Sequence, residues 1–292
     1  MAITDAIINY RRFLKRRNYS SYTVRNYICT VRQFVLWVNV PIEQVTAKTI
    51  VSFIDNLLNK RLQPKTINCY LDGIRSFYDY LINEEQVAMT HPVKRGYALR
   101  LSRPLPRYLR EEEVSRLFSS ITSRRDQAIF MLMLRCGLRV EEVAKLTMAA
   151  LDLPRSQLFV YEGKGLKDRV VYISHDAHQA LIEYLTLRPC KRAKRVFLVE
   201  KGRCEGRPIS VRGIQKRMEH YALRAGLKIS CHQLRHTMAT QLLNADADLV
   251  TIQDLLGHTR IKTTQRYCRV SNVKVQRDYH KAMTKVIQRH AL

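Results

Sequence analysis

CHQLRHTMATQLLNADADLVTIQDLLGHTRIKTTQRYCRVS occupies residues 231–271. Its apolar spacing predicts two helices, over residues 232–245 and 249–258. Four of its side chains can act on a phosphate: His232, Arg235, His258 and Tyr267. An arginine binds a phosphate through two parallel hydrogen bonds, a histidine moves protons near neutral pH, and a tyrosine hydroxyl can attack phosphorus to form a covalent ester. The stretch therefore predicts a site that breaks a phosphodiester by becoming attached to it.

The surroundings of Tyr267 set it apart from the other tyrosines of the chain. It lies in a polar segment with Arg266 and Arg269, and few of its sequence neighbours are apolar. We therefore expect an exposed hydroxyl that is available as a nucleophile.

The charge of the chain points to a polyanionic partner. The 292 residues include 51 lysines and arginines against 25 aspartates and glutamates, a net charge of +26. Such an excess repels itself unless nucleic acid or another polyanion neutralises it. A membrane surface fits less well, because the basic residues are spread along the chain and not gathered in one amphipathic tail. No apolar run approaches the roughly 18 residues that span a bilayer, and residues 1–17 lack a signal-peptide layout, so we expect a cytoplasmic, nucleoid-associated protein.

Cysteine and histidine spacing gives no sign of a metal site. The seven cysteines are scattered without a CxxC pair, which indicates neither a zinc knuckle nor a disulfide framework. His232 and His236 lie four residues apart, as in the HExxH zinc motif, but Gln233 stands where that motif needs glutamate. We expect no metal and no cofactor.

Residues 1–95 predict a helical DNA-binding domain. Its helices are expected over residues 5–17, from Ser20 or Ser21, after Thr46 and from Pro64. Basic side chains lie between the apolar positions and are the candidates for contact with DNA: Arg11, Arg12, Lys15, Arg25, Arg32, Lys65 and Arg75.

A basic linker is predicted over residues 96–108. The stretch that contains most of it, residues 92–106, holds three prolines and lacks an apolar helical stripe. Acidic residues 111–113 then suit the first turn of a helix, because they complement the helix dipole. The second domain is therefore expected to span residues 109–292.

The second domain is predicted to be mainly helical with a small antiparallel sheet. Residues 125–148 favour two helices that are broken at Cys136 and Gly137. Residues 157–163 and 168–174 alternate as strands do and flank a glycine-rich turn, which predicts a hairpin. Two further elements are expected, a third strand over residues 196–200 and a basic helix over residues 272–290.

Two arginines are candidate phosphate ligands. Arg139 follows the helix break at Gly137, and Arg235 lies in the HQLRH segment. In-line attack on a phosphodiester adds negative charge to the non-bridging oxygens. Guanidinium groups aimed at those oxygens would stabilise the transition state more than the ground state.

Proton transfer has several candidates. Lys164, between two glycines at the tip of the hairpin, could protonate the leaving oxygen, and Lys167 is its nearby rival. His232 and His258 could donate to the phosphate or move protons, although either could equally be a structural histidine.

Four segments in order resemble motifs of the tyrosine recombinase (phage integrase) family, which includes the Xer-type recombinases. The segments are GLRVEEVAKL (137–146), YEGKGLKDRVVYIS (161–174), HQLRHTMATQLL (232–243) and LLGHTRIKTTQRYCRVS (255–271). The resemblance extends to the N-terminal helices, as the family's SAM-like core-binding domain, and it implies a two-domain, C-shaped DNA clamp. It also implies a set of active-site residues with Tyr267 as the nucleophile: Arg139, Lys164, His232, Arg235, His258 and Tyr267.

The resemblance further implies a reaction and an assembly. Tyrosine attack would leave a 3′-phosphotyrosyl link and a free 5′-hydroxyl, and a partner strand would then attack that link without ATP or a divalent ion. The expected substrate is double-stranded DNA with an inverted-repeat core site. Four protomers, identical or of two kinds, would act on synapsed duplexes and exchange their C-terminal helices during integration, excision or resolution of DNA.

Two other functions fit part of the pattern. A type IB topoisomerase-like relaxing enzyme would share the chemistry, but the N-terminal helical domain favours the recombinase. A non-catalytic DNA-binding regulator would need the same basic surface, yet it would gain nothing from Tyr267 beside phosphate ligands.

Overall fold

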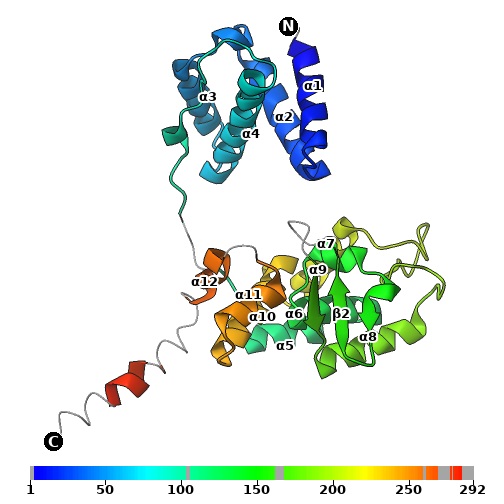
Figure 1. Cartoon of the computed structure of the whole chain (residues 1–292). Coiled ribbons are helices and arrows are strands. Elements are labelled where there is room, and N and C mark those ends of the chain that lie inside the picture. The colour runs from blue at the N-terminus through cyan, green and yellow to red at the C-terminus, as the bar shows by residue number, and fades with distance from the viewer. Residues whose placement is uncertain are drawn as a thin grey trace, which may run out of the picture. The chain divides into compact units, whose positions relative to one another are not determined.

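The computed structural model describes residues 3–102, 106–161, 168–258, 261–268, 277 and 279–284. The chain divides into two compact units, residues 1–103 and 104–292 (Figure 1). Each unit has its own buried apolar core. The division falls within the stretch that the sequence analysis assigns to a linker.

Helices build the N-terminal unit, and they confirm the four that the sequence predicts: α1 (Ile3–Arg16), α2 (Ser21–Trp37), α3 (Ala47–Asn59) and α4 (Pro64–Asn83). The side chain of Ser20 caps α2 by accepting from the backbone N–H of Thr23, and Thr46 caps α3 through Thr49 in the same way. Pro64 lies in the first turn of α4, where its missing N–H has no helical partner to lose. A short 3₁₀ helix, η1 (Ile42–Gln44), connects α2 to α3.

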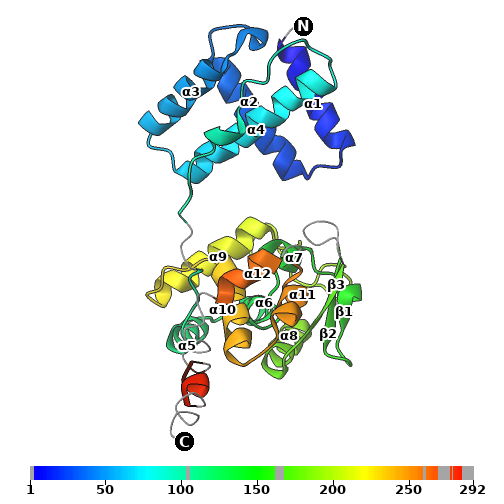
Figure 2. The same cartoon turned by 60° about the vertical axis from the view of Figure 1, so that its left-hand side comes forward.

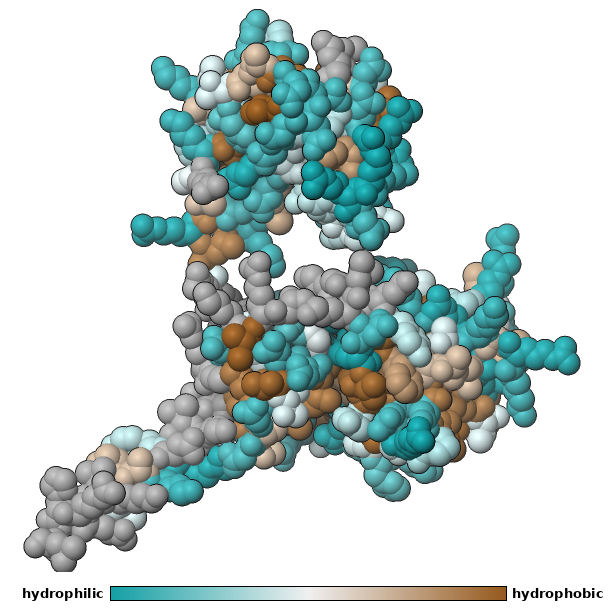
Figure 3. All heavy atoms as spheres, viewed as in Figure 1, coloured by the Kyte–Doolittle hydropathy of each residue, from teal (hydrophilic) through white to brown (hydrophobic). Residues whose placement is uncertain are grey.

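Aromatic side chains fill the core of this unit. Tyr10, Phe34 and Phe77 are buried, and the rings of Tyr10 and Phe77 meet edge-on with their centroids 5.2 Å apart. Helices α2 and α4 approach closely at Gly73, where a Cβ atom would lie 3.0 Å from Cγ2 of Thr30. The face of the unit seen in Figure 3 is mainly hydrophilic.

The segment after α4 remains attached to its own unit as far as Leu99. It includes a 3₁₀ turn, η2 (Arg95–Tyr97). The N–H of Leu99 donates to Oδ1 of Asn68 at 2.8 Å, and its carbonyl accepts from Nδ2 of Asn68 at 2.9 Å. In the second unit the N–H of Leu109 donates to Oγ1 of Thr237 at 2.9 Å. The chain between Leu99 and Leu109 therefore makes the connection.

The second unit is mainly helical with one small sheet, as predicted. Its described elements are α5 (Glu111–Ser119), α6 (Arg124–Arg135), α7 (Val140–Lys145), η3 (Met148–Ala150), β1 (Leu151–Asp152), β2 (Gln157–Val160), β3 (Arg169–Tyr172), α8 (His175–Leu187), α9 (Val211–Arg224), α10 (Cys231–Asn244), α11 (Leu249–Leu256) and α12 (Ile261–Cys268). The break at Cys136 and Gly137 separates α6 from α7, as the sequence predicts. Within the described parts of the chain, no helix is long and apolar enough to cross a membrane.

The sheet contains the predicted hairpin but a different third strand. Strands pair antiparallel in the order β1–β2–β3, with Leu158 opposite Val171. The third strand expected over residues 196–200 is wrong, because that stretch forms only an isolated bridge between Leu198 and Pro208. Its apolar residues reflect burial in the core and not pairing in the sheet. The basic helix expected over residues 272–290 lies largely outside the described residues.

Gly137 lets α7 begin close to α10 and α11. Its φ of 63° is a left-handed conformation that glycine adopts without strain. A Cβ atom at this position would lie 3.0 Å from Leu256 and 3.1 Å from Met238. Figure 2 shows α10, α11 and α12 side by side, and a small apolar cluster joins the three helices.

Candidate active site

Separate elements of the second unit supply the predicted site residues. Arg139 is the N-cap of α7, Arg235 lies in α10, His258 follows the C-cap of α11, and Tyr267 lies in α12. Helices α10, α11 and α12 pack against one another, and Nη2 of Arg139 reaches the end of α11 by donating to the carbonyls of Leu256 and Gly257 at 3.4 Å, so residues far apart in sequence come together. The predicted convergence of two arginines, a histidine and a tyrosine is therefore present in the fold.

Glu142 links Arg139 to a further arginine, Arg169 of β3. Nη1 of Arg139 donates to Oε1 of Glu142 at 2.7 Å, and the backbone N–H of Arg139 donates to Oε2 at 2.7 Å. Arg169 donates to both carboxylate oxygens, at 2.9 and 2.8 Å. Burial alone would raise the pKa of Glu142, but the hydrogen bonds and charge of Arg169, followed by those of Arg139, lower it to about 2. This carboxylate is therefore ionised and holds both guanidinium groups in place.

Arg235 is almost fully buried, with 1% of its surface exposed. Its guanidinium donates to the backbone carbonyls of Gly137 and Leu256. Burial, and then the positive charge of Arg139, lowers the pKa of Arg235 to about 9, which leaves it protonated at neutral pH. Arg139 and Arg169 thus share one carboxylate, and the charge of Arg235 is influenced by the same carboxylate without a hydrogen bond to it. Three arginines beside one carboxylate leave an excess of positive charge that favours an anion at this place.

His258 is positioned by the end of α11. Gly257 adopts a φ of 58° there, and the N–H of His258 donates to the carbonyl of Gln253 at 3.1 Å, which closes the helix. Nδ1 of His258 lies 2.9 Å from Oγ1 of Thr264. Burial, followed by the charges of Arg235 and Arg139, lowers the pKa of His258 to about 3. Its imidazole is therefore neutral at physiological pH.

Tyr267 is buried, which corrects the expectation of an exposed hydroxyl. Only 2% of its surface is accessible, and it packs in the apolar cluster with Met238, Leu243 and Leu256. Polar sequence neighbours gave the wrong expectation, because the apolar partners come from α10 and α11. Thr264, three residues earlier on α12, is also fully buried, so this face of the helix points inward. The ring of Tyr267 stacks on that of His258 with centroids 6.4 Å apart.

A residue without an assigned role, His236, bonds to Tyr267. Nδ1 of His236 lies 2.8 Å from the hydroxyl oxygen of Tyr267. His232, one turn earlier on α10, is exposed, and its ring centroid lies 4.3 Å from that of His236. His232 thus lies beside His236, on the exposed side of the contact between His236 and Tyr267. Lys164 and its rival Lys167 lie outside the described residues.

Sequence reasoning left three members of this group without a role: Glu142, Arg169 and His236. A signal existed for Glu142, because it follows Arg139 by three residues, the spacing of a capping box. Arg169 stands in a predicted strand, and nothing in a strand pattern says which helix its side chain will meet. Within the described residues, no three histidine, cysteine or acidic side chains are grouped as a metal site would need.

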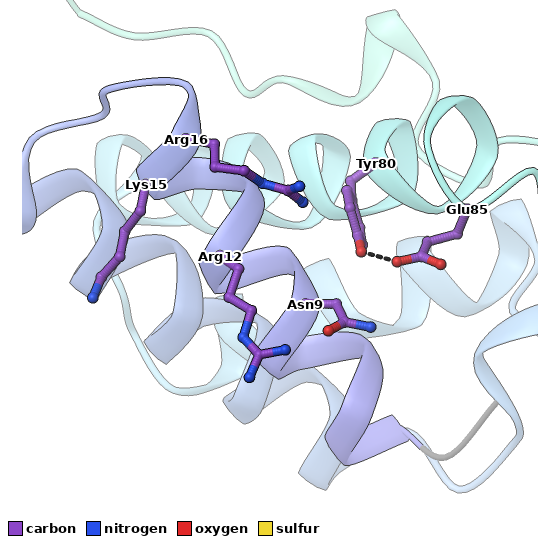
Figure 4. Close-up of a pocket in the computed structure, with 6 residues that line it drawn as sticks. All are labelled: Asn9, Arg12, Lys15, Arg16, Tyr80 and Glu85. Carbon is purple, nitrogen blue, oxygen red and sulfur yellow. Dashed lines mark hydrogen bonds between the residues drawn. The ribbon is translucent and has the colours of Figure 1, made fainter.

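The candidate DNA-binding residues of the N-terminal unit are mostly exposed. Arg75 is the exception: it is half-buried and lies 3.4 Å from Asp72. Arg12 and Lys15 of α1 line an open hollow of about 580 Å³ together with Asn9, Arg16, Tyr80 and Glu85 (Figure 4). The hydroxyl of Tyr80 donates to Glu85 on one side of it. No carboxylate of the described chain forms an ion pair with Arg12, Lys15 or Arg16, so these cations suit a phosphate backbone.

Comparisons with known proteins agree along most of the chain. Residues 107–273 match the Phage integrase family, and residues 7–87 match the phage integrase N-terminal SAM-like domain. Tyrosine recombinase XerC of Bacillus pumilus is 34% identical over 282 residues, which cover 90% of each protein. The crystal structure of XerA recombinase has a TM-score of 0.55 and 26% identity, covering 96% of this chain and 98% of that one. A lambda integrase tetramer bound to a Holliday junction has a TM-score of 0.74 at 16% identity, over 91% of this chain and 76% of that one, and so has the same fold.

Proposed function

This chain belongs to the phage integrase family and is a tyrosine site-specific recombinase, and from that premise we propose that it cuts and rejoins duplex DNA through Tyr267. The observation that carries the proposal is the convergence of Arg139, Arg235, His258 and Tyr267 around an excess of positive charge. Comparison favours neither a relaxing enzyme nor a non-catalytic regulator, because the relatives are named recombinases.

The cleavage step begins with a DNA phosphate at Arg139 and Arg235. The hydroxyl oxygen of Tyr267 attacks phosphorus in line with the bond to the 5′ oxygen. The two guanidinium groups stabilise the charge that grows on the non-bridging oxygens, and His232 and neutral His258 donate further hydrogen bonds to them. Lys164 protonates the departing 5′ oxygen. The products are a 3′-phosphotyrosyl link and a free 5′-hydroxyl.

Rejoining reverses these roles with a different strand. The 5′-hydroxyl of the partner strand attacks the phosphotyrosyl link and releases Tyr267. One phosphodiester replaces another, so the exchange needs no ATP, and in this proposal no divalent ion takes part. The cations of Arg139 and Arg235 perform the charge stabilisation that a metal ion performs in other phosphoryl-transfer sites.

Both units contact the duplex in this proposal. The predicted DNA-binding domain, residues 1–95, binds DNA through its exposed cations, among them Arg11, Arg12, Lys15, Arg25, Arg32 and Lys65, with Arg75 beside them. Residues 109–292 form the catalytic domain, and the basic linker 96–108 joins it to the DNA-binding domain. The target is a core site with inverted repeats.

Exchange between two duplexes requires four active sites. The lambda integrase tetramer on a Holliday junction supports a tetramer here as well, built from identical protomers or from two kinds. Residues 272–290 would pass between neighbouring protomers and couple their activity. The enzyme would integrate, excise or resolve DNA in the cytoplasm, close to the nucleoid.

A covalent-trapping assay tests this function. The wild-type protein and Tyr267→Phe are incubated in EDTA with nicked suicide DNA made from the region that flanks the gene. We expect an adduct that resists SDS from the wild-type protein alone. Cleavage by Tyr267→Phe would remove Tyr267 as the nucleophile, and a strict need for Mg²⁺ would contradict the metal-free step.

A further inference from the structure

We propose that His236 takes the proton of Tyr267 during cleavage and fixes the direction of its hydroxyl. The inference rests on the proposed function, in which Tyr267 is the nucleophile. It starts from the 2.8 Å contact between Nδ1 of His236 and the hydroxyl oxygen of Tyr267. A group that removes a proton from a nucleophile must lie within hydrogen-bond distance of it, and this contact satisfies that condition before DNA binds.

The position of His236 on α10 holds its contact with Tyr267 in place. His236 directly follows Arg235, whose guanidinium is fixed by the carbonyls of Gly137 and Leu256. The same helix buries Met238 and Leu243 against Tyr267. The phosphate ligand, the proton acceptor and the packing surface of the nucleophile therefore belong to one rigid element, and a rigid support keeps such groups in reacting geometry.

Other titratable groups near Tyr267 are engaged differently. Nδ1 of His258 is turned to Thr264, and the imidazole of His258 stacks parallel to the tyrosine ring at an interplanar angle of 9°. Glu142 accepts from both Arg139 and Arg169, so both of its oxygens are occupied. Nδ1 of His258 is thus engaged by Thr264, whereas Nδ1 of His236 lies at hydrogen-bond distance from the hydroxyl oxygen of Tyr267.

The proton step balances without another reactant. The O–H bond of Tyr267 breaks, its proton moves to Nδ1 of His236, and the oxygen forms a bond to phosphorus. The bond from phosphorus to the 5′ oxygen breaks, and that oxygen takes a proton from Lys164. In the rejoining step the attacking 5′-hydroxyl gives its proton to Lys164, and His236 returns its proton to the departing tyrosine oxygen.

The charges around His236 suit a transfer that depends on bound DNA. The rings of His232 and His236 lie 4.3 Å apart, and Arg235, Arg139, His232 and His236 all act electrostatically on His258, so these groups share one neighbourhood. Arg139 and Arg169 already occupy Glu142, so a proton on His236 adds to a positively charged site while no DNA is bound. A phosphate bound by the arginines supplies negative charge, which stabilises the imidazolium that forms.

Substitution of His236 by asparagine separates proton transfer from positioning. Asparagine can place a side-chain oxygen or nitrogen near the former Nδ1 and keep a hydrogen bond to Tyr267, but it does not accept a proton at neutral pH. His236→Phe removes both functions and keeps a ring. His220→Asn on the exposed surface of α9 is the matched control. Binding of the same DNA by gel shift establishes that each variant is folded.

The experiment measures single-turnover cleavage of two suicide substrates, one with the natural 5′ oxygen and one with a bridging sulfur in its place. A thiolate leaves without being protonated, so the sulfur substrate bypasses Lys164 but still requires Tyr267 to lose its proton. We expect His236→Asn to cleave both substrates about 10²–10⁴ times more slowly than the wild type. Lys164→Ala should regain cleavage activity on the sulfur substrate, and His220→Asn should cleave both substrates at the wild-type rate.

The pH profile gives a second reading of the same variants. Wild-type cleavage should fall at acidic pH as His236 becomes protonated, and His236→Asn should lose this limb of the profile. Three results would overturn the inference: wild-type rates in His236→Asn, faster cleavage in His236→Asn, or recovery of His236→Asn on the sulfur substrate. If Tyr267→Phe is inactive while any of these holds, the proposed function survives and the role of His236 alone fails.

Discussion

Two clusters in the second unit both consist of arginines around a buried carboxylate, but they differ in the balance of positive and negative charge. The Asp126 cluster contains Arg125, Asp126, Glu200, Arg217 and Tyr221. Arg125 donates to one oxygen of Asp126 at 2.8 and 2.7 Å, and Arg217 and Tyr221 donate to the other at 2.6 and 3.0 Å. Glu200 lies 3.8 Å from Arg125, so two arginines meet two carboxylates. The charges of this cluster therefore cancel, and its hydrogen bonds join α6 to α9.

The Glu142 cluster contains Arg139, Glu142, Arg169 and Arg235, and its charge is incomplete. Arg139 and Arg169 bind the one carboxylate, and Arg235 lies near enough for the charges of Glu142 and Tyr267 to influence it. Buried charges without partners are costly, so an excess of this kind persists where a ligand supplies the missing charge. The balance of charge, and not burial or arginine content, therefore separates the structural Asp126 cluster from the Glu142 cluster that we propose to be catalytic.

The largest expected effect is on stability, at the Asp126 cluster. Asp126→Ala leaves Arg125 and Arg217 without their shared carboxylate. The free energy of unfolding should fall by about 3–5 kcal/mol, as when one partner of a buried ion pair is removed. Urea denaturation measures the loss. The cleavage rate per folded molecule should stay within a few-fold of the wild type, and a large fall in that rate would break the comparison.

Arg139→Lys should show the opposite pattern. Lysine keeps the positive charge but loses the planar fork that addresses two acceptors at once. We expect cleavage to slow by about 10²–10³, as for the loss of one transition-state donor, while the free energy of unfolding changes by about 1 kcal/mol. Single-turnover cleavage and urea denaturation on the same preparation measure both. If the slower cleavage is fully explained by a smaller folded fraction of the variant, Arg139 has a structural role only.

Glu142→Gln tests the electrostatic link between the arginines. The pKa of Glu142 is about 2 in the folded protein and 4.5 ordinarily, so its ionised form stabilises the fold by about 3 kcal/mol above pH 4.5. That contribution is lost as the pH falls from about 4.5 to about 2. The variant should therefore be less stable than the wild type at pH 7, and the difference should shrink towards pH 2.

A matched control for this variant stands one residue earlier. Glu141 is exposed and pairs with Lys145 at 2.9 Å, so Glu141→Gln should change the free energy of unfolding by less than about 1 kcal/mol at any pH. Thermal unfolding followed between pH 2 and 7 compares the two variants. Parallel curves for both would contradict the lowered pKa of Glu142.

Gly137→Ala should have the smallest effect of the four changes. The added Cβ would meet Leu256 and Met238 in a left-handed backbone conformation, which costs about 1–2 kcal/mol of stability. Because the Gly137 carbonyl accepts from Arg235, cleavage should also slow, by less than for Arg139→Lys. The melting temperature and the cleavage rate measure the two effects. An unchanged rate would show that Arg235 does not depend on this carbonyl.

Much of the fold follows from local sequence. The four N-terminal helices were predictable because their caps and apolar spacing are local properties, as at Ser20, Thr46 and Pro64. The gathering of Arg139, Arg235, His258 and Tyr267 followed from a family resemblance and from the phosphate chemistry of these side chains. Spacing alone would not have placed them together.

The wrong predictions concern residues whose burial or pairing is decided by tertiary contacts. Tyr267 has polar neighbours in sequence, yet Met238 and Leu256 bury it from other helices. Residues 196–200 are apolar because they lie in the core, and an apolar run of five residues does not distinguish core from strand. The pairing of Glu142 with Arg169 joins a helix to a strand across 27 residues of sequence, and no periodicity reports such a contact.

The most direct test of the account is to identify the residue that carries the DNA. The wild-type adduct would be trapped on a suicide substrate in EDTA, trimmed with nuclease and digested with protease. Mass spectrometry of the peptides would then locate the attached nucleotide. The account predicts a 3′-linked nucleotide on Tyr267. A nucleotide on Tyr279 or another residue, or one linked through its 5′ phosphate, would contradict it.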